Sequence, residues 1–165
     1  IAHAYPRITV DGVDVDEDAI AAARHNAEQA GVADRVTLSV ANASDLNLSG
    51  RYDLVTIFEA LHDMSRPVEA LRAARELLGA DGTVLVVDEL VPEEFTAPAS
   101  LRERHEYGWS VVSCLPDAMG DPQTAATGAV MRPSLLRRYA AEAGFSDVEI
   151  LPIVTDFWRF YWLIP

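Results

Sequence analysis

The chain alternates between short apolar runs, which are typical of strands, and longer segments in which apolar residues recur every three or four positions, as in helices. Strands are predicted at 8–15, 36–40, 52–58 and 83–87. Helices are predicted at 19–30, from Pro67 to the glycines at 79 and 82, and at 134–143. This alternation predicts an α/β fold with a mostly parallel sheet and helices on both faces.

Two features near the end of the chain depart from that alternation. The last two apolar runs, 148–153 and 156–163, are separated only by Val154 and Thr155, which predicts an antiparallel hairpin. The segment from Leu90 to Met131 contains four prolines and is predicted to be partly helical around 101–114. Connections of this length are usually functional. We therefore expect residues 1–165 to form a single domain with a lid-like insertion at 90–131.

Composition narrows the choice of function. The chain has 165 residues, of which 50% are hydrophobic, and this is enough for a packed core. Its formal net charge of −13 repels phosphate, so nucleic acid is not an expected partner. The single cysteine, Cys114, excludes an internal disulfide framework, and no metal-ligand spacing such as HExxH occurs. No apolar run has the length of a membrane span, so we expect no membrane partner and a cytoplasmic setting.

Candidate binding residues follow the first two predicted strands, because parallel sheets bind ligands at the carboxyl ends of their strands. Asp14 ends the first run, before the predicted helix cap Asp16, and a carboxylate there can accept both hydroxyls of a ribose. After the second run, the Asn42 amide and a neighbouring backbone N–H could read the edge of a purine. The alternative is that these are ordinary polar turn residues.

The stretch after the third predicted strand, Phe58 to Met64, contains the most reactive groups. His62 can accept a proton near neutral pH, and Glu59 lies where the strand enters the predicted cleft. A purely structural capping histidine is the alternative. Four acids follow the fourth strand: Asp88, Glu89, Glu93 and Glu94. Some of them could orient a base or bind a substrate hydroxyl, but most are expected to be solvated. Cys114 has no basic neighbour in sequence and is expected to be a packing residue.

In order and spacing, these stretches resemble the class I S-adenosylmethionine-dependent methyltransferases, which have a Rossmann-like sheet with an antiparallel last strand. The resemblance lies in GVDVDEDAIAAAR (12–24), VTLSVANASDL (36–46), YDLVTIFEALHDM (52–64) and LLGADGTVLVVDE (77–89). It implies S-adenosylmethionine as cofactor, with Asp14 on the ribose and 36–46 near the adenine. The implied cofactor-binding residues are Asp14, Val15, Asn42, Ala43, Phe58 and Glu59. This chain departs from the family at Ala41-Asn42, where Gly-Asp is frequent.

His62-Asp63 is also similar to the His-Asp-Trp stretch that carries the catalytic histidine of small-molecule O-methyltransferases, with Met64 here in place of the Trp. The resemblance implies methyl transfer by direct displacement to a small-molecule acceptor, with a hydroxyl as the expected group. His62 would be the general base, and 90–131 would cover the acceptor. The insertion residues Tyr107, Trp109 and Met119 favour an apolar or aromatic acceptor.

One expected family feature is lacking. The family's first strand lies between the strands that correspond to 8–15 and 52–58 and ends in a glycine-rich loop, and this sequence has neither. We therefore expect the chain to be the carboxyl-terminal part of a longer methyltransferase that forms a homodimer through its amino-terminal region, and to bind the cofactor weakly by itself.

Two other functions stay open from the sequence. A nicotinamide-dependent oxidoreductase also uses an acid after its second strand. A non-catalytic methyltransferase-like module would explain both Asn42 and the missing loop.

Overall fold

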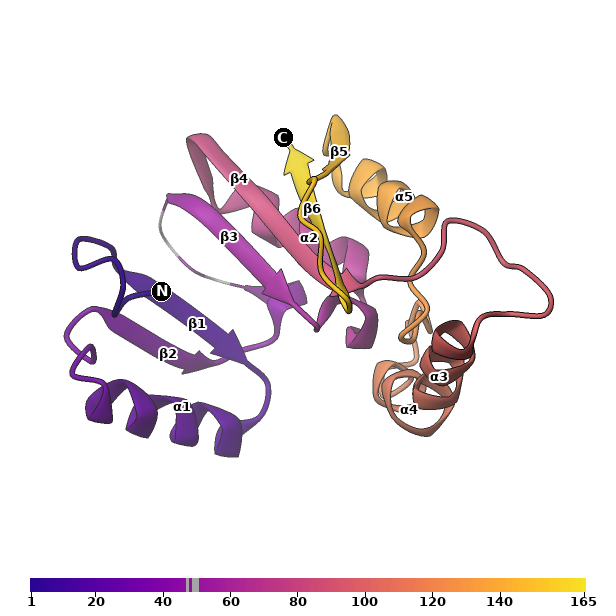
Figure 1. Ribbon diagram of the computed structural model, residues 1–165. Coiled ribbons are helices and arrows are strands. Elements are labelled where there is room, and N and C mark those ends of the chain that lie inside the picture. The colour runs from indigo at the N-terminus through magenta and orange to yellow at the C-terminus, as the bar shows by residue number, and fades with distance from the viewer. Residues whose placement is uncertain (47, 49–50) are drawn as a thin grey trace. The chain divides into compact units, whose positions relative to one another are not determined.

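The computed structural model describes residues 1–46, 48 and 51–165, and it divides the chain into two compact units, Ile1–Leu46 and Asn47–Pro165. Each unit has its own sheet (Figure 1). The sheet of the first unit has two strands, and that of the second has four strands in the order β3-β4-β6-β5.

The first unit consists of a parallel strand pair and one helix. Its elements are β1 (Val10–Asp14), α1 (Glu17–Gln29), β2 (Val36–Val40) and the 3-10 helix η1 (Ala43–Asp45). The predicted cap of α1 is confirmed, because the Asp16 carboxylate accepts hydrogen bonds from the N–H groups of Asp18 and Ala19 at 2.8 and 3.2 Å. The helix ends before Gly31, whose φ of 66° suits a residue without a side chain.

The second unit has the four strands β3 (Tyr52–Phe58), β4 (Leu78–Glu89), β5 (Asp147–Ile150) and β6 (Trp158–Ile164). Strands β3 and β4 are parallel, and β6 runs antiparallel to both β4 and β5. The predicted α/β class with an antiparallel last strand is confirmed. Among the described residues, β1 pairs only with β2 and β3 only with β4.

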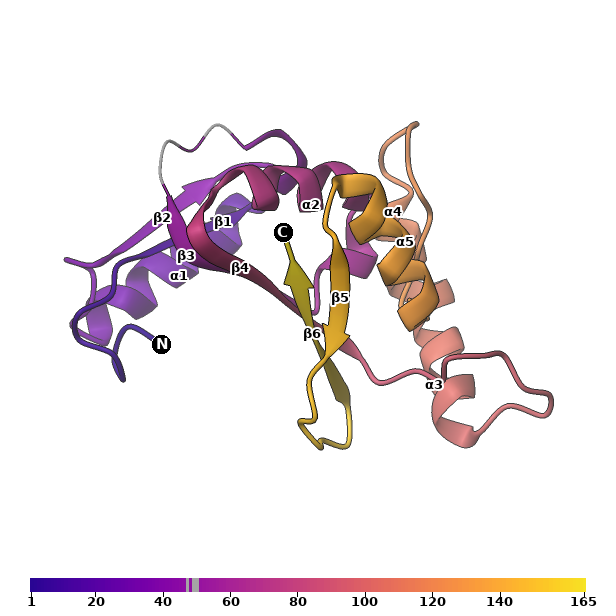
Figure 2. The ribbon, with the colours of Figure 1, turned by 90° about the horizontal axis from the view of Figure 1, so that it is seen from above.

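Helices α2 (Pro67–Glu76) and α5 (Pro133–Ala143) pack against each other on one face of the four-stranded sheet (Figure 2). Both begin with a proline, which is pre-organised for the first helical turn. Their apolar faces and the facing strand residues form the main core, which includes Leu71, Leu136, Tyr139, Val84, Val86, Tyr161 and Leu163.

The insertion between β4 and α5 is largely helical over its central part. It contains α3 (Leu101–Trp109), the π-helical segment η3 (Ser110–Cys114) and α4 (Leu115–Ala118). The Ser100 hydroxyl caps α3 by accepting the N–H of Glu103. Glu103 is buried and forms an ion pair of 2.5 Å with Arg132, the residue before α5, so α3 is anchored to the rest of the unit. None of the helices in the described ranges has the length and apolar character that crossing a membrane requires.

Two predicted boundaries were wrong. The helix that begins at Pro67 was expected to continue to Gly79 and Gly82, but strand β4 already begins at Leu78. Leu78 pairs with Tyr52 of β3, and the register of the two strands shifts after this pair. The hairpin at the end of the chain is real, but its loop is longer than Val154 and Thr155. Strand β5 ends at Ile150 and β6 begins at Trp158, and the Thr155 hydroxyl closes the loop on the backbone of Trp158.

Gly82 allows a close backbone approach between β3 and β4. A methyl group added there would lie 2.5 Å from the carbonyl oxygen of Tyr52 and 3.0 Å from the nitrogen of Gly79. We expect Gly82→Ala to lower the free energy of unfolding by about 1–3 kcal/mol, as measured by chemical denaturation. Gly108→Ala is the matched control, because nothing lies within 4 Å of its added methyl group and α3 should gain up to about 1 kcal/mol. Equal stabilities of the two variants would contradict this interpretation.

Candidate functional site

The first unit brings together the four predicted cofactor-binding residues that it contains. Strands β1 and β2 are parallel and in register, with Asp14 opposite Val40, so both strands end at the same edge. The N–H of Ala41 donates to the carbonyl oxygen of Asp14 at 2.8 Å, which links the turn after β1 to the turn after β2. Asp14, Val15, Asn42 and Ala43 therefore lie at one edge of this sheet, as the sequence predicted.

The polar side chains at this edge are fixed by local hydrogen bonds. Oδ1 of Asp14 accepts the N–H of Asp16 at 2.9 Å, and the side-chain oxygen of Asn42 caps η1 by accepting the N–H of Ser44 at 2.9 Å. Asp14 and Val15 are exposed to solvent. A carboxylate has two oxygens and an amide has a separate NH2 group, so both side chains keep capacity for a ligand.

In the second unit, the carboxyl end of β3 places Phe58 and Glu59 next to β4. The N–H of Glu59 donates to the carbonyl oxygen of Val87 at 2.9 Å, and Phe58 is half exposed. Glu59 has a φ of 47°, a left-handed conformation that is uncommon for a residue with a side chain and clusters at functional sites. Burial, followed by the charge of Asp88, raises the pKa of the Glu59 carboxyl.

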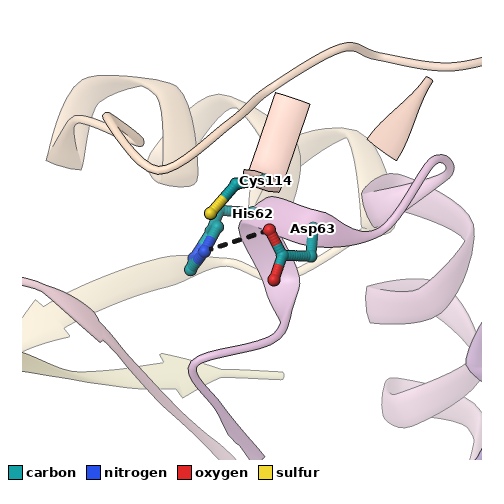
Figure 3. Close-up of side chains that lie close together, drawn as sticks. All are labelled: His62, Asp63 and Cys114. Carbon is teal, nitrogen blue, oxygen red and sulfur yellow. Dashed lines mark ion pairs between the residues drawn. The ribbon is translucent and has the colours of Figure 1, made fainter. Parts of the chain in front are cut away.

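His62 lies in the 3-10 helix η2 (Leu61–Asp63) and is the centre of a buried group of acids. It is only 2% exposed, and its Nδ1 donates to Oδ1 of Asp88 at 2.8 Å. Oε2 of Glu89 lies 3.2 Å from the same nitrogen. On the other side of the ring, Nε2 lies 3.2 Å from Oδ1 of Asp63, and the Cys114 side chain is adjacent (Figure 3).

These acids determine the charge of the imidazole. Burial by itself lowers the pKa of His62, but the contacts with Asp63 and Asp88 outweigh it and raise the pKa to about 12. His62 is therefore an imidazolium at neutral pH. Burial opposes ionisation of Asp63, but the contact with His62 prevails and lowers the pKa of that carboxyl. Burial and the neighbouring Asp88 raise the pKa of Glu89. His62, Asp63, Asp88 and Glu89 therefore gain and lose protons as a coupled set.

A cavity of about 490 Å³ in the second unit opens beside this group. It is lined by three acids, three aromatic rings, an arginine and a histidine: Glu59, Glu89, Glu106, Trp109, Phe157, Trp158, Arg102 and His105. Glu89 belongs both to this lining and to the contacts of His62. His62 itself is not among the lining residues, so Glu89 is the link between the imidazole and the cavity.

Sequence reasoning did not assign three residues to the His62 group. Asp88 was one of four acids of which some could orient a base and most were expected to be solvated. It is 1% exposed, because β4 is an inner strand between β3 and β6. Glu89 is likewise mostly covered, whereas Glu93 and Glu94 are exposed as expected. Cys114 is a buried residue as expected, but it packs on His62 and Asp63 rather than on apolar neighbours alone. The only signal was the position of Asp88 at the end of an apolar strand.

Comparison with known proteins settles the family. A sequence family described as "Methyltransferase domain" matches residues 1–84, which include Asp14, Asn42, Glu59 and His62. The chain belongs to this methyltransferase domain family. The match covers the first unit and continues through η2 and α2 into β4.

Solved structures agree with the methyltransferase fold. A candidate O-methyltransferase from Nostoc punctiforme matches with a TM-score of 0.75 and 22% identity, over 99% of this chain and 47% of that protein. An O-methyltransferase family protein from Burkholderia thailandensis matches with a TM-score of 0.74 and 17% identity, over 99% of this chain and 45% of that protein. The O-methyltransferase NcsB1 from neocarzinostatin biosynthesis matches with a TM-score of 0.71 and 20% identity, over 99% of this chain and 44% of that protein. The chain thus spans a little under half the length of these proteins.

The charge of His62 can be tested through Asp63. In the unaltered protein, with the pKa of His62 raised to about 12, we expect the imidazole to stay protonated across the accessible alkaline range. Asp63→Asn removes one of the anionic contacts, so the pKa of His62 should fall and its titration should move to lower pH. NMR of labelled imidazole nitrogens measures this directly. Asp117→Asn, an exposed acid on α4, is the matched control and should leave the titration unchanged. A His62 that titrates alike in all three proteins would refute the assignment.

Proposed function

We propose that this methyltransferase domain takes part in S-adenosylmethionine-dependent transfer of a methyl group to a hydroxyl of a small molecule. The observation that carries the proposal is the family match, because residues 1–84 contain the acidic end of β1, the turn after β2, and His62. NcsB1, which has the same fold, was solved with S-adenosyl-L-homocysteine and 1,4-dihydroxy-2-naphthoic acid.

The residues present in the first unit suit this cofactor. The exposed carboxylate of Asp14 would hold the ribose hydroxyls, and the amide of Asn42 with the backbone of Ala43 would contact the adenine. Val15 follows at the same edge. When bound, the cofactor supplies a methyl group on a sulfonium, which is already a good leaving group, so the protein mainly provides alignment.

The His62 group would provide the base that a hydroxyl acceptor needs. Glu89 reaches the cavity, and burial and Asp88 raise its pKa to about 9, so the ionised form that can accept a proton becomes more abundant as the pH rises toward 9. The positive charge of His62, fixed by Asp88, stabilises that ionised form. The acceptor proton would pass to the ionised carboxylate of Glu89, which contacts the acceptor, while His62 remains an imidazolium.

The lining of the cavity indicates which acceptors fit. Trp109, Phe157 and Trp158 offer flat apolar surface, which suits an aromatic ring. Arg102 already lies over the Phe157 ring at 5.3 Å and 3.7 Å from Glu106, so its positive charge is compensated and attracts an anionic substituent only weakly. A neutral or cationic phenol is the acceptor class that these residues favour. Insertion residues on α3 form part of this lining, and 90–131 would thereby shield the acceptor from water.

Ligand-observed NMR, which detects weak binding, tests the cofactor and the alternatives together. We expect S-adenosylhomocysteine to give saturation-transfer signals on its adenine and ribose protons, and NAD to give none. Asp14→Asn should weaken binding at least tenfold by removing the ribose acceptor, and Asp34→Asn, an exposed acid in the same unit, is the control.

Two outcomes would contradict the proposal. Binding of NAD without S-adenosylhomocysteine would favour an oxidoreductase. Binding of neither, by a protein whose circular dichroism spectrum shows that it is folded, would favour a non-catalytic module.

A further inference from the structure

The side chains of His62, Asp63 and Cys114 form a cluster on the side of the imidazole that faces away from Asp88 and Glu89. His62 and Asp63 come from η2, and Cys114 is the last residue of the π-helical segment η3. One nitrogen, oxygen or sulfur atom from each residue lies within 4.8 Å of the other two (Figure 3). The methyl transfer proposed above uses the Nδ1 side of His62, where Glu89 lies, and assigns Asp63 and Cys114 no contact with the acceptor.

The geometry of the carboxylate is unusual for a simple hydrogen-bonded contact. Oδ1 of Asp63 is buried and lies 3.2 Å from Nε2 of His62, an ion pair that does not have the geometry of a hydrogen bond. A cation held between the carboxylate and the imidazole would satisfy both groups in this arrangement.

The hydrogen bond of the other ring nitrogen, Nδ1, is of the kind found in metal-binding histidines. Histidines that bind a metal through one ring nitrogen almost always donate the other N–H to a carboxylate or carbonyl, which fixes the ring. Nδ1 of His62 donates in this way to Oδ1 of Asp88 at 2.8 Å, and Asp88 is 1% exposed. Nε2 is therefore the nitrogen left to point at Asp63 and Cys114.

We propose that His62, Asp63 and Cys114 form a binding site for a zinc-class divalent cation. Imidazole, carboxylate and thiolate are the three side-chain ligands of zinc, and a thiolate disfavours the hard cations magnesium and calcium. Three protein ligands leave a fourth tetrahedral position for water. This site shares His62 with the proposed methyl transfer, and a cation on Nε2 would replace the proton that keeps the imidazole charged, so the two uses of His62 would compete.

The distances between the three ligand atoms and the exposure of the Asp63 side chain allow a cation to enter the site. Ligand atoms about 2.0–2.3 Å from a tetrahedral zinc lie roughly 3.3–3.8 Å apart, so the cluster needs to contract by about 1 Å. The Asp63 side chain is 38% exposed and provides both the entry path and the freedom to move. Binding would displace the protons on Nε2 and on the thiol, and the Cys114 thiolate and the Asp63 carboxylate would together balance the two positive charges of the cation.

Cobalt(II) is the most direct probe, because it replaces zinc in such sites and reports its ligands by absorption. We expect the untagged protein to bind one cobalt ion per chain, with the near-ultraviolet charge-transfer band of a cobalt–thiolate bond, and zinc to abolish the band by competition. Cys114→Ser should lose the band, and Asp63→Asn should bind cobalt at least tenfold more weakly. His25→Gln, an exposed histidine on α1 that hydrogen-bonds Gln29, is the matched control and should bind as the unaltered protein does.

Absence of the thiolate band in the unaltered, folded protein at millimolar cobalt would overturn the proposal, and this result needs no variant. A band that persists in Cys114→Ser, or equal affinity of Asp63→Asn and the unaltered protein, would also overturn it. Because the readout is absorption and not methyl transfer, a failure here is separate from a failure of the proposed enzyme activity.

Discussion

The buried hydrogen bond between His62 and Asp88 is the interaction on which the second unit's site depends. It joins η2, which follows β3, to the end of β4 across 26 positions of sequence. Both side chains are almost completely buried, and a buried ion pair that loses one partner typically costs about 3–5 kcal/mol. The bond therefore fixes which ring nitrogen faces the cavity side and which faces Cys114.

Because of this hydrogen bond, the two nitrogens of the His62 ring face different sets of side chains. On the Nδ1 side, Glu89 connects the imidazolium to a cavity lined by aromatic and acidic groups. On the Nε2 side, Asp63 and Cys114 complete a set of nitrogen, oxygen and sulfur donors. A charged histidine surrounded by acids is a costly structure in a protein interior, and such arrangements are concentrated at functional sites. The left-handed backbone of Glu59, next to the same group, is a second costly feature at the same place.

The features that could be predicted from the sequence are those that depend on local residue patterns and on the pairing of parallel strands. Strands β2 and β3 occupy the predicted ranges, Asp16 caps α1, and Asp14 and Asn42 meet at one edge because both strands run in the same direction. The burial of Asp88 could not be predicted, since it depends on β6 covering β4 from the other end of the chain. The approach of Cys114 to His62 likewise depends on how the insertion folds back onto η2, and no periodicity in the sequence encodes it.

Transfer of an isotopically labelled methyl group from S-adenosylmethionine to a neutral phenol tests the role of the His62 group. We expect labelled methyl ether product, with at least about a hundredfold loss in both His62→Asn and Glu89→Gln, as for removal of a general base. The exposed neighbour Glu94→Gln should retain the full rate. Product formation by Glu89→Gln or His62→Asn at the unaltered rate would contradict this assignment of the base.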